Sequence, residues 1–119
     1  MEREDRQFLL MTAWLFAKHG QQNRARSLCE ALVEEDPRDG IAAAVLAELL
    51  LADRNPSRAL AVIRAAVCPK ELSRVAAVLE TRALIALGRR EDGARRWKRY
   101  IEASKGGRRA WAGNGGAVG

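Results

Sequence analysis

A period of 34 residues constrains the fold of this chain more than any other feature of its sequence. The interval from Gly20 to Arg54 and the interval from Arg54 to Gly88 both have this length. Small and then apolar residues keep step with the same period, at Ala25, Ala59, Gly93, Cys29, Ile63 and Trp97. Size and polarity that recur at fixed offsets over such an interval are typical of a repeated helix-turn-helix unit.

Three repeats follow from this period, at residues 6–39, 40–73 and 74–107. The length of the unit is that of a tetratricopeptide repeat, in which two helices form a hairpin and successive hairpins stack. We therefore predict an all-α fold of three tetratricopeptide-like hairpins, or six helices, in a short right-handed solenoid. One domain spans residues 1–104, and the glycine-rich basic segment 105–119 is predicted to be a flexible tail because it has no apolar period.

Helix-ending residues divide the three repeats into six expected helices. Gly20 and Gly88 can adopt a positive φ and end a helix. Pro37, Pro56 and Pro69 interrupt a helical pattern or fit the first turn of the next helix. The expected helices cover about residues 4–19, 22–35, 38–53, 56–67, 71–87 and 91–104.

The composition is that of an aliphatic helical protein. Hydrophobic residues make up 48% of the 119 residues and aromatic residues 5%, so the helices are expected to pack through Ala and Leu. No run approaches the roughly 20 apolar residues of a membrane span, and the first residues, MEREDRQ, are charged rather than signal-like. We therefore expect a cytoplasmic protein with no transmembrane segment.

The sequence lacks the residue patterns that catalysis or metal binding needs. It has no glycine-rich phosphate loop and no nucleophile motif, and Cys29 and Cys68 have neither a metal-binding spacing nor a nearby histidine. Both cysteines are interpreted as small core residues on the second helices of the first two repeats. His19, the single histidine, is placed to meet the dipole at the end of a helix. We expect no enzyme activity, no metal and no cofactor.

The expected function lies in a surface, and the repeat geometry indicates which one. In stacked helical hairpins the first helix of each repeat lines a concave groove through its second, fifth, ninth and twelfth positions. In this chain those positions are Gln7, Leu10, Trp14, Ala17, Ile41, Ala44, Glu48, Leu51, Val75, Val78, Arg82 and Ile85. Most are apolar, which predicts that a partner segment or self-association covers the groove. The alternative is that the three hairpins close up and bury it.

The ninth position of the three repeats holds Trp14, Glu48 and Arg82. A large aromatic side chain beside an acid and a base can anchor an amphipathic helix or an extended peptide and fix its register. Trp14 is therefore the predicted anchor of the groove.

The net charge of +6 is concentrated near the C-terminus. Residues 1–88 contain 12 basic and 12 acidic residues, whereas residues 89–109 contain nine basic and three acidic ones. The predicted basic patch consists of Arg89, Arg90, Arg95, Arg96, Lys98 and Arg99. It is interpreted as a solvated helix face, with nucleic acid, an acidic protein or membrane headgroups as alternative partners. Trp97 is assigned to core packing rather than to base stacking, while Trp111 has no evident core to join.

Two stretches resemble a known family. The run FLLMTAWLFAKHGQQNRARSLCEALVEEDP, residues 8–37, is similar to the opening of the small tetratricopeptide chaperones of type III secretion systems, in particular the YscY (SctY) type. The run TRALIALGRREDGARRWKRYIEAS, residues 81–104, is similar to the last repeat of that family, with aromatic residues at Trp97 and Tyr100. Gly93, where the repeat prefers alanine, and the basic tail depart from the family's pattern.

The resemblance implies a cytoplasmic chaperone of the secretion apparatus. It would hold a helical segment of a small secreted YscX-type protein in the groove around Leu10, Trp14, Leu51 and Ile85. As a pair the two proteins would engage the YscV-type export-gate protein, which gives the chain a peripheral place at the inner membrane. A chaperone of the needle subunit or of the translocators is the alternative within the same system. A basic helical-repeat protein that binds nucleic acid is the alternative outside it.

Overall fold

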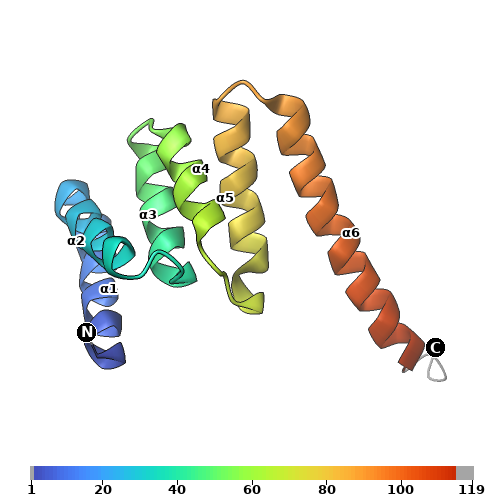
Figure 1. Cartoon of the computed structure of the whole chain (residues 1–119), viewed down its shortest axis with the longest axis horizontal. Helices are drawn as coiled ribbons and strands as arrows, with labels where there is room; N and C mark the ends of the chain where they lie inside the picture. Colours follow the sequence, from blue (N-terminus) through green and yellow to red (C-terminus); the bar gives the residue numbers. More distant parts are fainter. Residues whose placement is uncertain (1, 115–119) are drawn as a thin grey trace.

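The chain folds into helices that pack side by side in the order of the sequence (Figure 1). The computed structural model describes the backbone of residues 2–114 and the side chains of residues 2–106. Each α-helix contacts the next one along the chain, and α3 also contacts α5. The predicted all-α class is confirmed for the described residues. Its elements are α1 (Arg3–Lys18), α2 (Gln22–Glu35), α3 (Gly40–Ala52), α4 (Pro56–Ala65), the short 3₁₀ helix η1 (Lys70–Leu72), α5 (Ser73–Ala86) and α6 (Arg90–Asn114).

Three turns of the same geometry join α1 to α2, α3 to α4 and α5 to α6. Their central residues are Gly20, Arg54 and Gly88, with φ of 78°, 58° and 79°. The next amide donates in each case to a carbonyl in the last turn of the preceding helix, at 2.8–2.9 Å, in the pairs Gln21–Phe16, Asn55–Leu50 and Arg89–Leu84. This is the Schellman pattern of helix ending. The turns therefore recur at the 34-residue interval that the sequence predicted.

Three helix boundaries lie two residues from their predicted positions, and each difference has a local cause. Helix α3 begins at Gly40 instead of residue 38, because the Asp39 side chain caps it and Pro37 lies in the turn before it. Helix α4 ends at Ala65, because Ala66 is extended. Before α5 the chain forms η1, so that α5 begins at Ser73.

Helix α6 continues past its predicted end at Ser104 and reaches Asn114. Much of the segment predicted as a flexible tail is thus helical, whereas residues 115–119 lie outside the described part of the chain. Lys, Arg and Ala have high helix propensity, and extending an existing helix avoids the cost of nucleating a new one. The prediction gave more weight to the glycine content than to these terms, and therefore placed the end of the helix at residue 104.

The core consists of small and branched aliphatic side chains gathered around α3. This helix buries Ala42, Ala43, Leu46, Ala47 and Leu50 almost completely, and α1, α2 and α4 cover it through their own buried alanines. A smaller cluster of Leu60, Ala83 and Leu84 joins α4 to α5.

The two cysteines do not have the same environment. Cys29 on α2 has no exposed surface, and burial, with a smaller contribution from the nearby Glu30 carboxylate, raises the pKa of its thiol to about 11. The thiol is therefore neutral at physiological pH, as expected of a core residue. Cys68 lies in the connection between α4 and η1, not on a helix as predicted, and is half-buried. His19 is the C-cap residue of α1, which agrees with its predicted position.

The Arg6–Asp39 pair fastens α1 to the start of α3. Nη2 of Arg6 lies 2.8 Å from Oδ2 of Asp39 and 3.0 Å from the carbonyl oxygen of Leu32 on α2. The other carboxylate oxygen, Oδ1, accepts from the amides of Ile41 and Ala42, both at 3.1 Å. One carboxylate thus caps α3 and binds α1, while one guanidinium also binds the end of α2.

The charge of Asp39 should stabilise the fold in a pH-dependent way. Burial alone raises the pKa of Asp39, but hydrogen bonds from Arg6, Ala42 and Ile41 outweigh it, and the pKa lies below its usual value. A carboxylate whose pKa falls on folding contributes its full stabilisation above the unfolded-state pKa of about 4. This contribution is lost as the pH falls through the lower, folded-state pKa.

Asp39→Ala is expected to cost about 2 kcal/mol of unfolding free energy at pH 7, because it removes both the helix cap and the partner of Arg6. Asp39→Asn keeps a good capping side chain and should cost less. Urea denaturation would measure both. Below about pH 4 the difference between wild type and D39N should shrink, and a difference independent of pH would contradict the assigned role of the charge.

Gly40→Ala is expected to destabilise the fold by about 1–3 kcal/mol, because the connection after α4 passes directly over this residue. A Cβ at position 40 would lie 2.7 Å from Cα of Cys68 and 2.8 Å from the carbonyl oxygen of Val67, both backbone atoms. Gly106→Ala is the control, since a Cβ there meets no atom within 4 Å. Urea denaturation should show no loss of stability for G106A, and the higher helix propensity of alanine should add up to about 1 kcal/mol; equal destabilisation by both changes would contradict the close approach at Gly40.

Candidate functional site

An open groove runs along one face of the protein, between α1, α3 and α5. It consists of two adjoining hollows of about 470 and 510 Å³ that share Trp14, Ile41 and Val45. We refer to the two together as the groove. Its lining comprises Gln7, Leu10, Met11, Trp14, Leu15, Ala17, Lys18, Ile41, Ala44, Val45, Glu48, Leu49, Leu72, Val75 and Leu79.

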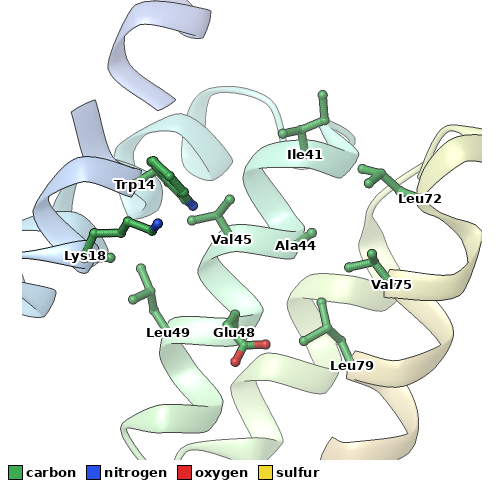
Figure 2. Close-up of a pocket in the computed structure, with 11 residues that line it drawn as sticks. Trp14, Lys18, Ile41, Ala44, Val45, Glu48, Leu49, Leu72, Val75 and Leu79 are labelled. Atoms are coloured by element: carbon green, nitrogen blue, oxygen red, sulfur yellow. The ribbon is translucent and has the colours of Figure 1, made fainter. Parts of the chain in front are cut away.

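Helical spacing places these side chains along one line on each helix. Leu10, Trp14 and Ala17 follow one another at intervals of four and three residues on α1, so they share a face. The same rule aligns Ile41 with Glu48 on α3. Figure 2 shows the Trp14 side of the groove opposite the side formed by α5, with α3 between them. The groove is therefore a product of regular helix geometry.

The groove keeps large apolar side chains in contact with water. Trp14 is 48% exposed, Ile41 49% and Val75 42%, although each lies beside other apolar groups. Three hairpins of this length have thus left the groove open. Each Å² of apolar surface removed from water contributes roughly 25 cal/mol of favourable free energy. An apolar segment that covered these side chains would therefore bind favourably in the groove.

Trp14 is held in position by its own helix. Nζ of Lys18, one turn further along α1, lies 4.4 Å from the centroid of the Trp14 ring. Such a cation–π contact favours the orientation of the indole seen in Figure 2, where the ring lies near Val45. The anchor predicted from the sequence is therefore partly preorganised.

Glu48 and Arg82 form an ion pair at the far end of the groove. Nη1 of Arg82 on α5 lies 2.8 Å from Oε2 of Glu48 on α3. Both side chains remain about half exposed, at 57% for Glu48 and 48% for Arg82. Charges in this position are available to a polar group of a bound segment.

The structure places eight of the twelve predicted groove residues along the groove and four elsewhere. The eight are Gln7, Leu10, Trp14, Ala17, Ile41, Ala44, Glu48 and Val75. Leu51 packs against both core clusters, and Val78 is half-buried outside the lining. Arg82 reaches the groove only through its pair with Glu48. Ile85 lies toward α6, where its Cγ1 is 3.1 Å from the position that a Cβ of Gly93 would occupy.

Seven lining residues were not predicted: Met11, Leu15, Lys18, Val45, Leu49, Leu72 and Leu79. Most of them stand next to a predicted position or one turn from it. The prediction allowed one line of residues on each helix, whereas the groove is wide enough to expose the neighbouring lines as well. The apolar character of six of these positions was the available signal, whereas the charged Lys18 offered none.

The predicted basic patch on α6 is partly neutralised by acidic residues. Arg89 and Arg95 both bind Asp92, and the hydrogen bond from Arg89 contributes most to lowering the pKa of that carboxyl group. Arg96 binds Glu80 on α5 at 3.0 Å. The remaining members of the patch, Arg90, Lys98 and Arg99, are exposed.

The described residues hold neither a candidate metal site nor a candidate membrane span. No three or more His, Cys, Asp or Glu residues within the described part of the chain gather where they could hold a metal ion. Within the same part, every helix is too short or too polar to cross a membrane. Comparison of the chain with protein-family models, with curated proteins and with solved structures gives no match. The groove is the candidate site because it exposes Trp14, Ile41 and Val75 in one hollow.

Glu48→Gln is expected to change the unfolding free energy by less than about 1 kcal/mol, because exposed ion pairs contribute little. Glu80→Gln is the matched comparison, since its carboxylate is 13% exposed and accepts from Arg64 and Arg96. It should cost more, about 1.5–3 kcal/mol. Urea denaturation of both variants would test this order, and a larger loss for E48Q would mean that the groove pair is structural.

Proposed function

We propose that this protein is a helical-repeat chaperone that binds an apolar helical segment of another protein in the groove. The observation that carries the proposal is the exposure of Trp14, Ile41 and Val75 in the same open hollow. A groove of this kind suits an amphipathic helix whose apolar residues recur every three or four positions. Covering them would shield the partner's own apolar face from aggregation.

In this proposal the three hairpins are tetratricopeptide-like repeats stacked in a short right-handed solenoid. The recurrence of one turn geometry at Gly20, Arg54 and Gly88 supports this arrangement. The additional contact between α3 and α5 also supports it, because the first helices of neighbouring repeats touch in such a stack. The groove between α1, α3 and α5 is then the concave face.

The resemblance of residues 8–37 and 81–104 to YscY-type chaperones suggests the class of partner. We infer that the bound segment belongs to a small secreted protein of the YscX type and that the pair is presented to the YscV-type export gate. The protein would act in the cytoplasm, with a peripheral position at the inner-membrane apparatus, and without catalysis or a cofactor. A needle-subunit or translocator chaperone would use the same groove and differ in the protein that it holds.

Trp14→Ala should weaken binding of the partner by about 30-fold or more, because a buried aromatic anchor is the typical hot spot of such an interface. Phe8→Ala is the matched control: Phe8 lies on the same helix and is 69% exposed but does not line the groove. The partner would be identified by cross-linking and mass spectrometry in the native cell, and its affinity measured by titration calorimetry.

Circular dichroism should give the same helix content for W14A, F8A and wild type. A small secreted protein that binds wild type and F8A equally, and W14A weakly, would support the proposal. Equal affinity for all three variants would remove the groove as the binding site. Recovery of RNA alone would favour the nucleic-acid alternative.

A further inference from the structure

A second hollow, of about 550 Å³, lies between α4, α5 and α6 and shares no lining residue with the groove. Three guanidinium groups line it, from Arg64, Arg96 and Arg99, together with the carboxylate of Glu80. We call it the arginine cleft. The apolar part of its wall includes Ile63 of α4. Charged and apolar groups therefore meet in one concave site.

The Glu80 carboxylate organises two of the three arginines. Its Oε2 accepts from Nε of Arg64 at 3.2 Å, and its Oε1 accepts from Nε of Arg96 at 3.0 Å. The side chains of Glu80 and Arg96 are 13% and 17% exposed, so this pair forms the inner part of the cleft. Both guanidiniums bind Glu80 through Nε, which directs their terminal NH₂ groups to other acceptors.

The arginine cleft carries more positive than negative charge. Three arginines and one glutamate line it, and no acidic side chain among residues 2–106 forms an ion pair with Arg99. Arg99 is exposed at the rim, whereas Arg96 lies deeper. The site can accept a further anionic group without losing the contacts of Glu80.

We propose that the arginine cleft is a docking site for an acidic segment of a partner protein, whose Asp or Glu side chain binds Arg99 and the free donors of Arg64 and Arg96. Arginine suits this task because its planar donors match the two oxygens of a carboxylate. The apolar wall accommodates the methylene groups of the acidic residue or a neighbouring apolar side chain. This site is separate from the groove and binds a different segment.

The same features disfavour nucleic acid as the occupant. Glu80 already occupies the Nε donors of Arg64 and Arg96, and the remaining donors suit a single anionic group, whereas a phosphate backbone carries a charge at every nucleotide. The aromatic rings nearest in sequence, Trp97 and Tyr100, are half-buried and pack on each other with their centroids 5.3 Å apart. They are therefore occupied, whereas binding of single strands needs free aromatic faces for base stacking.

Cys68 provides a local probe of occupancy. It lines the arginine cleft and is half-buried, whereas the other cysteine, Cys29, has no exposed surface. Burial raises the pKa of the Cys68 thiol, and the charge of Arg96 offsets part of this effect. Iodoacetamide at mildly alkaline pH should therefore alkylate Cys68 alone in the folded protein, and a segment bound in the cleft should slow that reaction.

The test compares Arg99→Gln with Arg90→Gln in the full chain. Both residues are exposed on α6 and both changes remove one positive charge, but only Arg99 lines the arginine cleft. Fluorescence anisotropy would measure binding of a glutamate-rich peptide, of an RNA oligonucleotide of equal charge and of anionic lipid vesicles. R99Q should weaken binding of the peptide about fivefold and R90Q less than about twofold.

The acidic peptide should also slow alkylation of Cys68, and W14A should bind it as wild type does, which separates this site from the groove. Equal weakening by R99Q and R90Q would show that net charge, not the cleft, attracts the peptide. That result, unchanged alkylation of Cys68, or tighter binding of RNA or vesicles than of the peptide would overturn the proposal.

Discussion

The contact between Arg6 and Asp39 is the interaction on which the working geometry of this protein depends. Helix α1 stands at one end of the row and contacts α2 as its main neighbour, so α2 alone would leave its position relative to α3 loosely defined. Arg6 binds the carboxylate that caps α3 and the last turn of α2. The first helix is therefore fixed at its start, and Trp14, two turns further on, lies opposite α3 at a defined distance. The ion pair between Arg6 and Asp39 thus determines the shape of the apolar groove, although neither residue lines it.

The groove stays open because other side chains already fill the hydrophobic core. The alanines of α3 let α1, α2 and α4 approach closely, and this close packing fills the interior with small side chains. The apolar side chains of Trp14, Ile41 and Val75 lie outside this core and are 48%, 49% and 42% exposed. Exposed apolar surface of this kind carries a risk of aggregation, which covering the groove would remove.

Periodicity was enough to predict the helices and the turns but not the long-range contacts. The 34-residue interval located Gly20, Arg54 and Gly88, although Arg54 has a side chain that would not by itself suggest a left-handed turn. It also predicted most of the groove, since helical spacing is a local property. Ile85 was misplaced because Gly93 lets it lie toward α6. The pairing of Arg6 with Asp39, and the passage of Cys68 over Gly40, join residues far apart in the sequence and leave no local signal.

Helix α5 contributes to two surfaces at once. Val75 and Leu79 line the groove, whereas Ala76 and Glu80, each one residue further on, line the arginine cleft. A single helix turns as a rigid rod, so any rotation of α5 that widens one hollow changes the other. A segment bound in the groove and a segment bound in the arginine cleft would then be coupled energetically without touching. Each would change the binding affinity of the other by the same factor. Because α5 alone separates the groove from the arginine cleft, the position of this helix would decide which of the two sites is filled first.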